Sequence, residues 1–273
     1  MNIKSHPRPQ NVRFQVGTSG FMTTQKQWCK MGALNCIEFN SSFYKIPSDK
    51  SIENLLSLPD NISVIIKVSK YITHIKRLKD IKDAWLRLWQ QISKLRSKLK
   101  CVLFQMPPSF MQTCLNIQRI IDIKSYVSDD LNVAFEFRHI SWLNKYTTEL
   151  FNKLKWCIVG TYIIKQNNSK WIGTMPSGLC IYDETCNFNY IRIHGKKGWK
   201  GLITNVELQK IKERMAVQKV STSIVMFNNT FFEHKTTERK LINDLPIKYA
   251  AVQNAVEFAL IKQKRVLTKE LTF

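Results

Sequence analysis

The sequence predicts a protein of the α/β class built as a single (β/α)8 TIM-like barrel, and two observations carry that prediction. Eight short β-type runs recur along the chain, and their first residues lie 30 residues apart on average. A strand, a crossover helix and two loops need about 30 residues. The runs are also nearly continuous in apolar residues, which is typical of parallel strands buried on both faces. An open doubly wound sheet is the alternative, although no G-x-G-x-x-G sequence follows the first run.

The predicted elements alternate along the chain. The expected strands are Phe14–Thr18, Cys36–Asn40, Val64–Val68, Cys101–Gln105, Val133–Phe137, Cys157–Thr161, Tyr190–His194 and Ile224–Asn228. The clearest helical patterns are Asp80–Leu99, Val206–Met215 and Ala250–Ile261. In the first of these, Trp85 and its apolar neighbours recur at helical spacing, so we expect that face to pack on the core.

The chain has 273 residues, of which 44% are apolar, and this composition argues against a largely disordered protein. We expect a basic tail over residues 1–13, one barrel domain over 14–262 and a C-terminal tail over 263–273. A polar insertion, Asn229–Pro246, follows the last predicted strand.

The net charge predicts an anionic partner. Lys and Arg number 42 against 20 Asp and Glu, so the formal charge is +22. The basic residues are dense in the segment Lys67–Lys100, which holds eleven of them and two acidic residues. Tyr71 and His74 are interleaved with the first of these, a pattern that suits a nucleic-acid backbone. From Arg87 to Lys100 the favoured interpretation is a solvated outer helix face.

The sequence favours a cytoplasmic, reducing compartment and no membrane partner. No apolar stretch approaches the roughly 20 residues of a spanning helix. The first ten residues, MNIKSHPRPQ, lack the apolar region of a secretory signal. The seven cysteines form no C-x-x-C pair, which indicates free thiols rather than a disulfide framework.

Polar residues gather at the ends of the predicted strands, where the active sites of TIM barrels lie. They are Glu38, Asn40, Lys67, Gln105, Glu136, Arg138, His139, Arg192, His194, Asn228 and Asn229. Because a buried ion is costly unless it is paired, we expect Glu136 to pair with Arg138 or Arg192 inside the barrel mouth. The alternative is that these ions form a structural network that only closes the mouth.

The loop after the seventh strand reads HGKKGWKG and predicts a phosphate site. Gly195 allows close backbone approach and Lys196 supplies a positive charge, at a position where barrels often bind phosphate. The alternative is an ordinary solvated basic loop.

The sequence identifies no cofactor and predicts no metal ligands. His74, His139 and His194 would be the donors, with Glu38 and Glu136, if Zn or Mn were bound. No H-E-x-x-H or H-x-x-x-H spacing is present, and Lys67, Arg138 and Arg192 would repel a cation.

Taken in order, the strand-end strings resemble the YecE-like family of uncharacterised proteins, the domain of unknown function numbered seventy-two. The strings are VGTSGF, IEFNSSFYKIPS, KVSKYITH, LFQMPPSF, AFEFRHISW, YIRIHG and FNN followed by AVQNAVEF. The resemblance runs from Phe14 to Ile261 and implies a TIM-like barrel. It also adds Tyr44 and Trp142 to the expected site residues. The similarity of such barrels to metal-dependent endonucleases suggests nucleic-acid binding by analogy of fold.

The sequence departs from that family at three places. The sixth strand runs on as GTYIIK where relatives often carry an Asp, and Phe21 stands where Trp is usual. The segment after Asn229 is also longer than in relatives, so the loop over the mouth differs.

Three functions remain open. The leading hypothesis is a barrel that binds nucleic acid, with a possible phosphodiesterase or endonuclease activity. Glu38 or Glu136 would then be the general base, His74 or His194 the general acid, and Arg138 and Arg192 would hold phosphate. Asn40 and Asn228 would orient the substrate. The alternatives are an enzyme acting on a small phosphorylated sugar or nucleotide, and a non-enzymatic interaction protein whose barrel network is structural.

Overall fold

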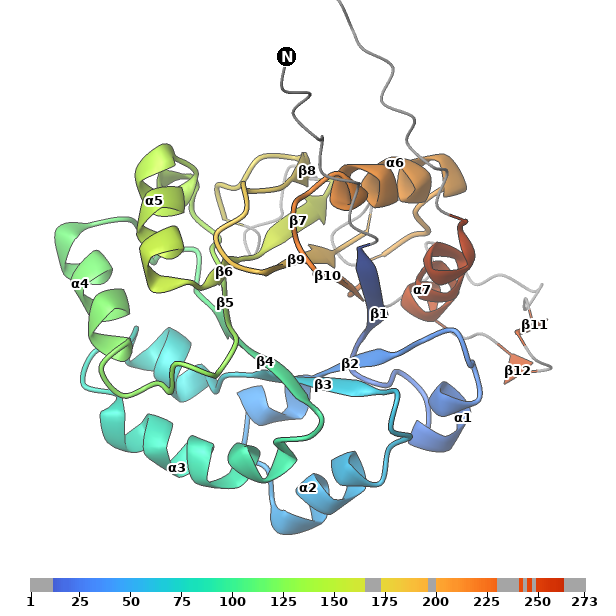
Figure 1. The fold of residues 1–273 in the computed structure, drawn as a ribbon, viewed down its shortest axis with the longest axis horizontal. Helices are drawn as coiled ribbons and strands as arrows, with labels where there is room; N and C mark the ends of the chain where they lie inside the picture. Colours follow the sequence, from blue (N-terminus) through green and yellow to red (C-terminus); the bar gives the residue numbers. More distant parts are fainter. Residues whose placement is uncertain are drawn as a thin grey trace, which may run out of the picture.

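The computed structural model describes residues 12–164, 173–195, 200–229, 241–242, 245–246 and 249–262. A ring of strands occupies the centre and helices surround it (Figure 1). The strands are β1 (Arg13–Ser19), β2 (Cys36–Phe39), β3 (Ser63–Lys67), β4 (Leu99–Gln105), β5 (Val133–Glu136), β6 (Cys157–Ile158), β7 (Gly160–Ile163), β8 (Gly178–Cys180), β9 (Phe188–Ile193), β10 (Thr222–Phe227), β11 (Leu241–Ile242) and β12 (Leu245–Pro246). The α-helices are α1 (Gln25–Cys29), α2 (Asp49–Leu56), α3 (Lys82–Ile92), α4 (Cys114–Ile123), α5 (Lys145–Leu154), α6 (Asn205–Ala216) and α7 (Ala250–Leu260).

The ring of strands is closed by the continuous segment β6–Val159–β7, rather than by hydrogen bonds between β6 and β7. β6 pairs in parallel with β5, and β7 pairs in parallel with β9, while Val159 alone separates β6 from β7. The remaining neighbours, from β1 through β5 and from β9 through β10 back to β1, are also parallel. With β6 and β7 taken as the two halves of one strand, all eight predicted strands are present. The predicted TIM-like barrel is confirmed.

The sixth unit differs from a regular βα repeat. β8 pairs antiparallel with β7, so the chain that follows the sixth strand includes a hairpin strand. No helix stands between β7 and β9 in the residues described there, which omit 165–172. The sequence did not reveal β8, because Gly178–Cys180 is too short to carry a periodic pattern.

Helix α3 is shorter than the predicted Asp80–Leu99. It ends at Ile92, and a 3-10 turn, η3 (Ser93–Leu95), follows it before β4 begins at Leu99. Lys98, which we expected on a solvated face, is buried and donates hydrogen bonds from Nζ to the carbonyl oxygens of Leu58 and Pro59 at 2.7 and 3.0 Å.

The inward-facing residues of the barrel form layers, as expected for this fold. Toward the amino ends of the strands the layers are apolar and include Cys36, Ile65, Cys101, Ala134, Phe188 and Ile224. Further along the same face of each strand, two or four residues on, polar groups replace them. On β9, for example, Phe188 and Tyr190 are followed by Arg192. The candidate site is therefore one layer of a packed barrel.

Several expectations fall on residues outside the described part of the chain. They are residues 1–11 of the expected N-terminal tail, the C-terminal tail 263–273, Lys196 with 197–199 of the glycine-rich loop, and most of the insertion after Asn229. All seven cysteines are described, and each has a free thiol. In the described part of the chain, no helix has the length and apolar character needed to cross a membrane.

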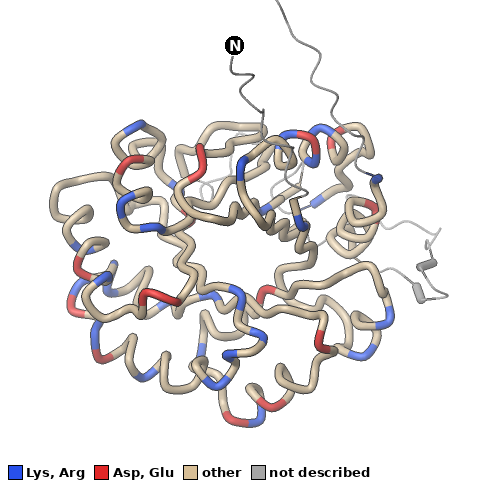
Figure 2. Tube along the Cα trace, viewed as in Figure 1, with Lys and Arg blue, Asp and Glu red and all other residues tan. Residues whose placement is uncertain are grey.

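The positive charge is spread around the molecule. Figure 2 shows Lys and Arg on helices all around the barrel rather than on one side. The total charge therefore does not identify the barrel mouth as a binding site. That assignment depends on the local arrangement of side chains at the mouth.

Candidate functional site

Arg192 lies at the centre of a buried polar layer at the carboxyl ends of the strands. Its Nη2 and Nε donate to the two carboxylate oxygens of Glu38 at 2.7 and 2.9 Å, and its Nη1 donates to Glu136 Oε2 at 2.5 Å. Gln105 Oε1 accepts a further bond from Nη1 at 3.2 Å. Tyr190 donates its hydroxyl to Glu38. Every nitrogen of this guanidinium is thus engaged inside the barrel.

A second chain of contacts runs from Glu136 toward the surface. Arg138 forms an ion pair with Glu136, and its Nη2 lies 3.3 Å from His194 Nε2. Asn228 Nδ2 lies 3.3 Å from His194 Nδ1. The predicted pairing of Glu136 with Arg138 or Arg192 is confirmed, since Glu136 contacts both.

The charges of this layer stabilise one another. Burial alone would raise the pKa of both carboxyls, but Arg192 and Lys67 hold the pKa of Glu38 below its ordinary value. Arg138 and Arg192 do the same, more strongly, for the pKa of Glu136. Burial would lower the pKa of Arg192, but Glu136 and Glu38 raise it. Two carboxylates and two guanidiniums give a formal charge of zero, so this network is a neutral floor beneath the mouth.

Lys67 stands apart from that floor. Its Nζ lies 4.2 Å from the ring centre of Phe43, and no carboxylate of the described residues lies within ion-pair distance of it. Burial, and then repulsion by Arg192, lowers the pKa of Lys67 to about 8. Ser42 holds the Phe43 turn in place, because its Oγ donates to the carbonyl oxygen of Lys67 at 2.7 Å. Lys67 is thus a half-buried cation that forms no close ion pair with the described carboxylates.

His74 lies next to this lysine. Its ring packs edge-on against Phe43 with the ring centres 5.0 Å apart, and its Nδ1 lies 2.9 Å from Thr73 Oγ1. Burial, and then the positive charge of Lys67, lowers the pKa of His74 to about 4. The imidazole is therefore neutral near pH 7 and suits hydrogen bonding rather than proton donation.

Trp142 does not lie in the mouth, and its expected substrate role is corrected. It is fully buried, and its indole stacks on Phe137 at a centroid distance of 4.2 Å and on Phe110 at 5.7 Å. Its Nε1 donates to the carbonyl oxygen of Phe110 at 2.8 Å. This is a core residue, because a side chain without exposed surface cannot touch a ligand.

Two residues near the seventh loop also position backbone rather than face the mouth. Asn229 is buried and donates from Nδ2 to the carbonyl oxygen of Gly201 and to Asn254 at 3.0 and 2.8 Å. Gly195 has φ of +81°, and a Cβ there would lie 2.6 Å from the carbonyl oxygen of Lys200. Both expected binding residues therefore shape the loop that begins at His194. His139 similarly caps η4 (Ile140–Trp142), accepting from the Ser141 amide at 3.2 Å.

The accessible members of the predicted set lie at the carboxyl ends of several strands. Asn40, Lys67, His74, Gln105 and Asn228 are half-buried, and Tyr44 is 81% exposed. By contrast, Glu38, Glu136, Arg138, Arg192 and His194 are buried and bonded to one another. A ligand at this face would meet the first group and not the second.

The geometry does not support the acid–base roles expected of the buried residues. Both glutamates are fully buried and paired with arginine, so neither carboxylate is exposed to a ligand at the mouth. Burial, and then the charge of Arg138, lowers the pKa of His194 to about 4, so the imidazole is neutral near pH 7 rather than poised as a general acid. These roles stay predictions. Among the described residues, no group of three or more His, Cys, Asp and Glu side chains could hold a metal ion.

Sequence reasoning missed three contributors to the layer. Ser19 lies 3.4 Å from Arg192, Tyr190 bonds Glu38, and Phe43 packs under Lys67. Tyr190 could have been found, because it lies two residues before Arg192 and thus on the same face of β9. Phe43 lies in the string IEFNSSFYKIPS that carries the family resemblance, but its contact with Lys67 depends on a 3-10 turn, η1 (Asn40–Phe43), which sets its direction.

The burial of His194 predicts a loss of stability in mild acid. Its folded pKa of about 4 is below the ordinary 6.5, so the unfolded state binds more protons between these values. We expect the contribution of His194 to the free energy of unfolding to fall by about 2 kcal/mol between about pH 7 and about pH 5. Urea unfolding of the wild type and of His194→Asn across this range measures it. A wild-type slope equal to that of the variant would contradict the assignment.

Comparison with known proteins agrees with the fold. The sequence profile described as "Protein of unknown function DUF72" matches residues 29–258. A DUF72 family protein of Enterococcus faecalis superposes with a TM-score of 0.72 at 17% identity, covering 95% of this chain and 100% of its own. A DUF72 family protein of Thermotoga maritima superposes with a TM-score of 0.70 at 24% identity, covering 90% and 97%. At these identities the solved structures show the fold alone. No curated protein matches the sequence.

Proposed function

The chain belongs to the DUF72 family of proteins of unknown function, and we propose that it binds a phosphate-bearing ligand, nucleic acid, at the carboxyl-end face of its barrel. The observation that carries the proposal is Lys67. It is a half-buried cation without a carboxylate partner among the described residues, above a floor whose charges cancel. An anion at this position would gain a charge-assisted hydrogen bond without breaking an existing ion pair.

Nucleic acid is favoured over a small phosphorylated molecule because the positive charge extends beyond Lys67. Lys70 and Lys45 are exposed next to the mouth, and exposed Tyr44 offers a flat aromatic surface. A long phosphate backbone can use a series of such cations, whereas a small phosphate needs one. The small-molecule alternative relies on the glycine-rich loop, of which residues 196–199 lie outside the described residues.

The proposal is binding, without a cleavage step. A phosphodiesterase would need a protonated group to aid the leaving oxygen. The pKa values of about 4 at His74 and His194 leave both imidazoles neutral near pH 7. Neither imidazole is therefore poised as the general acid expected of it, and the proposal stops at binding.

We expect Lys67→Met to weaken binding of a short labelled single-stranded DNA about tenfold at low salt, since it removes one charge-assisted contact. The slope of log affinity against log salt concentration should become shallower by about one, the value expected for one lost phosphate contact. Binding by the wild type should also weaken as pH rises through the Lys67 pKa of about 8, because the amine loses its charge. The variant should not show this decline. Fluorescence anisotropy across salt and pH series measures all three effects.

Lys210→Met is the matched control, since Lys210 is exposed on the outer helix α6. It should alter affinity less than twofold. Lys67→Met should also fold normally, because burial disfavours the lysine charge in the folded state. An affinity equal to that of the wild type in Lys67→Met would refute the site. Inorganic phosphate and unlabelled oligonucleotide can each be added to displace the labelled DNA. If phosphate is as effective as the oligonucleotide at equal phosphate concentration, the small-molecule alternative is favoured.

A further inference from the structure

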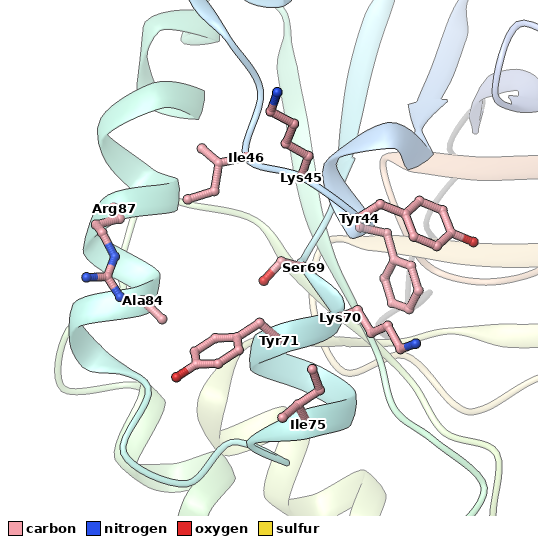
Figure 3. Close-up of a pocket in the computed structure, with 10 residues that line it drawn as sticks. Tyr44, Lys45, Ile46, Ser69, Lys70, Tyr71, Ile75, Ala84 and Arg87 are labelled. Atoms are coloured by element: carbon pink, nitrogen blue, oxygen red, sulfur yellow. The ribbon is translucent and has the colours of Figure 1, made fainter.

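A pocket of about 280 Å³ lies beside the barrel mouth, between the turns after β2 and β3 and helix α3 (Figure 3). It is distinct from the buried network, since none of the residues of that network lines it. Ligand pockets in proteins usually span about 300 to 1,000 Å³, so this one lies just below that range and suits a small group.

Large apolar side chains that ought to be buried are exposed here. Tyr44, Tyr71 and Ile75 line the pocket and are 81%, 45% and 64% exposed. Ile46 joins them at 38%. Isolated exposed apolar residues need no explanation, but several around one hollow indicate a binding site.

The polar lining of the pocket is cationic. Lys45, Lys70 and Arg87 line it, and no Asp or Glu does. Figure 3 shows Tyr71 and Arg87 on the α3 side and Tyr44 and Lys70 on the opposite side, with the Ser69 hydroxyl between them. A ligand with an aromatic body and negative charge would match this lining.

An unusual backbone conformation presents Tyr71 and Ile75 to the pocket. Both belong to a π-helical turn, η2 (Tyr71–Ile75), in which the Lys76 amide donates to the Tyr71 carbonyl oxygen at 2.8 Å. Arg77 and Leu78, which follow, have φ of +47° and +64°. Turns of this kind are rare in proteins, and those that occur are often found at functional sites.

Phe43 connects the pocket to the mouth. Its ring lies under Lys67 Nζ at 4.2 Å and against His74, and the same residue lines the pocket. A flexible polymer that reaches Lys67 could therefore extend one unit further into the pocket.

From these observations we infer that the pocket receives one unpaired base of a single-stranded nucleic acid, which stacks on Tyr71 while the flanking phosphates lie against Lys45, Lys70 and Arg87. The inference rests on the proposed function, because the same strand would contact Lys67. It adds a preference for single strands, since the bases of a duplex are already stacked and paired and cannot enter.

The test compares Tyr71→Ala with Tyr71→Phe. Loss of one stacking platform should weaken binding of a short single-stranded DNA about 5- to 100-fold, whereas the phenyl ring should keep nearly all of the affinity. The exposed Tyr146 on α5 is a matched control, and Tyr146→Ala should bind as the wild type does. A strand of the same length made of abasic units should bind wild type and Tyr71→Ala equally.

Each other result overturns the inference in a recognisable way. Binding that depends on Lys67 but not on Tyr71 would refute the base pocket and leave the proposed function standing. Failure of the wild type to bind any oligonucleotide would refute both. Equal affinity for single strand and duplex would contradict the unpaired base. If polyglutamate displaces the labelled DNA as effectively as unlabelled oligonucleotide does, the pocket would be assigned to an acidic polypeptide instead.

Discussion

Replacing Arg192 by methionine is expected to lower the free energy of unfolding by about 3 to 5 kcal/mol, a large part of the stability of a typical domain. The variant would leave two buried carboxylates, Glu38 and Glu136, without the guanidinium that bonds both. Burial raises the pKa of each carboxyl when the opposing charge is removed. We therefore expect both groups to titrate at higher pH in the variant, so its stability should fall less steeply in acid than that of the wild type. Urea unfolding at several pH values measures this.

Two further variants identify the cause of the loss. Arg214 is an exposed arginine on α6, and Arg214→Met should change stability by less than about 0.5 kcal/mol. Adding Glu38→Gln to Arg192→Met should recover part of the loss, because Glu38 is the carboxylate left without an ion-pair partner, whereas Glu136 keeps Arg138. A loss under about 1 kcal/mol in Arg192→Met alone would mean that water, rather than ion pairing, satisfies the carboxylates.

The strands and their inward faces could be predicted from the sequence because the barrel imposes a period of two on every strand. Glu38, Glu136 and Arg192 share their faces with apolar residues two positions earlier, and this pattern placed all three in one layer. Short helices such as α1 could not be predicted in the same way. It has five residues and one buried side chain, Trp28, so it shows no periodicity.

Which ions of the layer are free to bind could not be predicted from residue types. Arg192 and Lys67 are both cations at strand ends, and the sequence predicts both as members of the site. Only the structure distinguishes the two cations: Arg192 is bonded to two carboxylates, whereas the amine of Lys67 lies over the ring of Phe43. Similarly, helical periodicity in the sequence does not reveal the π-helical turn at Tyr71. The pocket beside this turn therefore could not be predicted.

Replacing Trp142 is the second change expected to lower the free energy of unfolding strongly. It also distinguishes a residue needed for folding from one needed for ligand binding. Trp142→Ala would empty a fully buried site between Phe137 and Phe110 and leave the Phe110 carbonyl oxygen without its donor. The expected loss is about 3 to 5 kcal/mol of unfolding free energy. Trp142→Phe should lose less, because a smaller ring keeps the stacking and forfeits the hydrogen bond. Urea unfolding of the two variants measures both losses.

The same variants decide whether Trp142 belongs to the site. Under conditions where both remain folded, Trp142→Phe should bind single-stranded DNA with wild-type affinity, because the indole has no exposed surface. Lys67→Met should show the reverse pattern, with weaker binding and unimpaired stability, because burial lowers the pKa of Lys67 and disfavours its charge in the folded state. A tenfold loss of affinity in Trp142→Phe at unchanged stability would return Trp142 to the ligand-binding set. The two residues were predicted for one role, and the barrel separates them because one lies in its core and the other above its neutral floor.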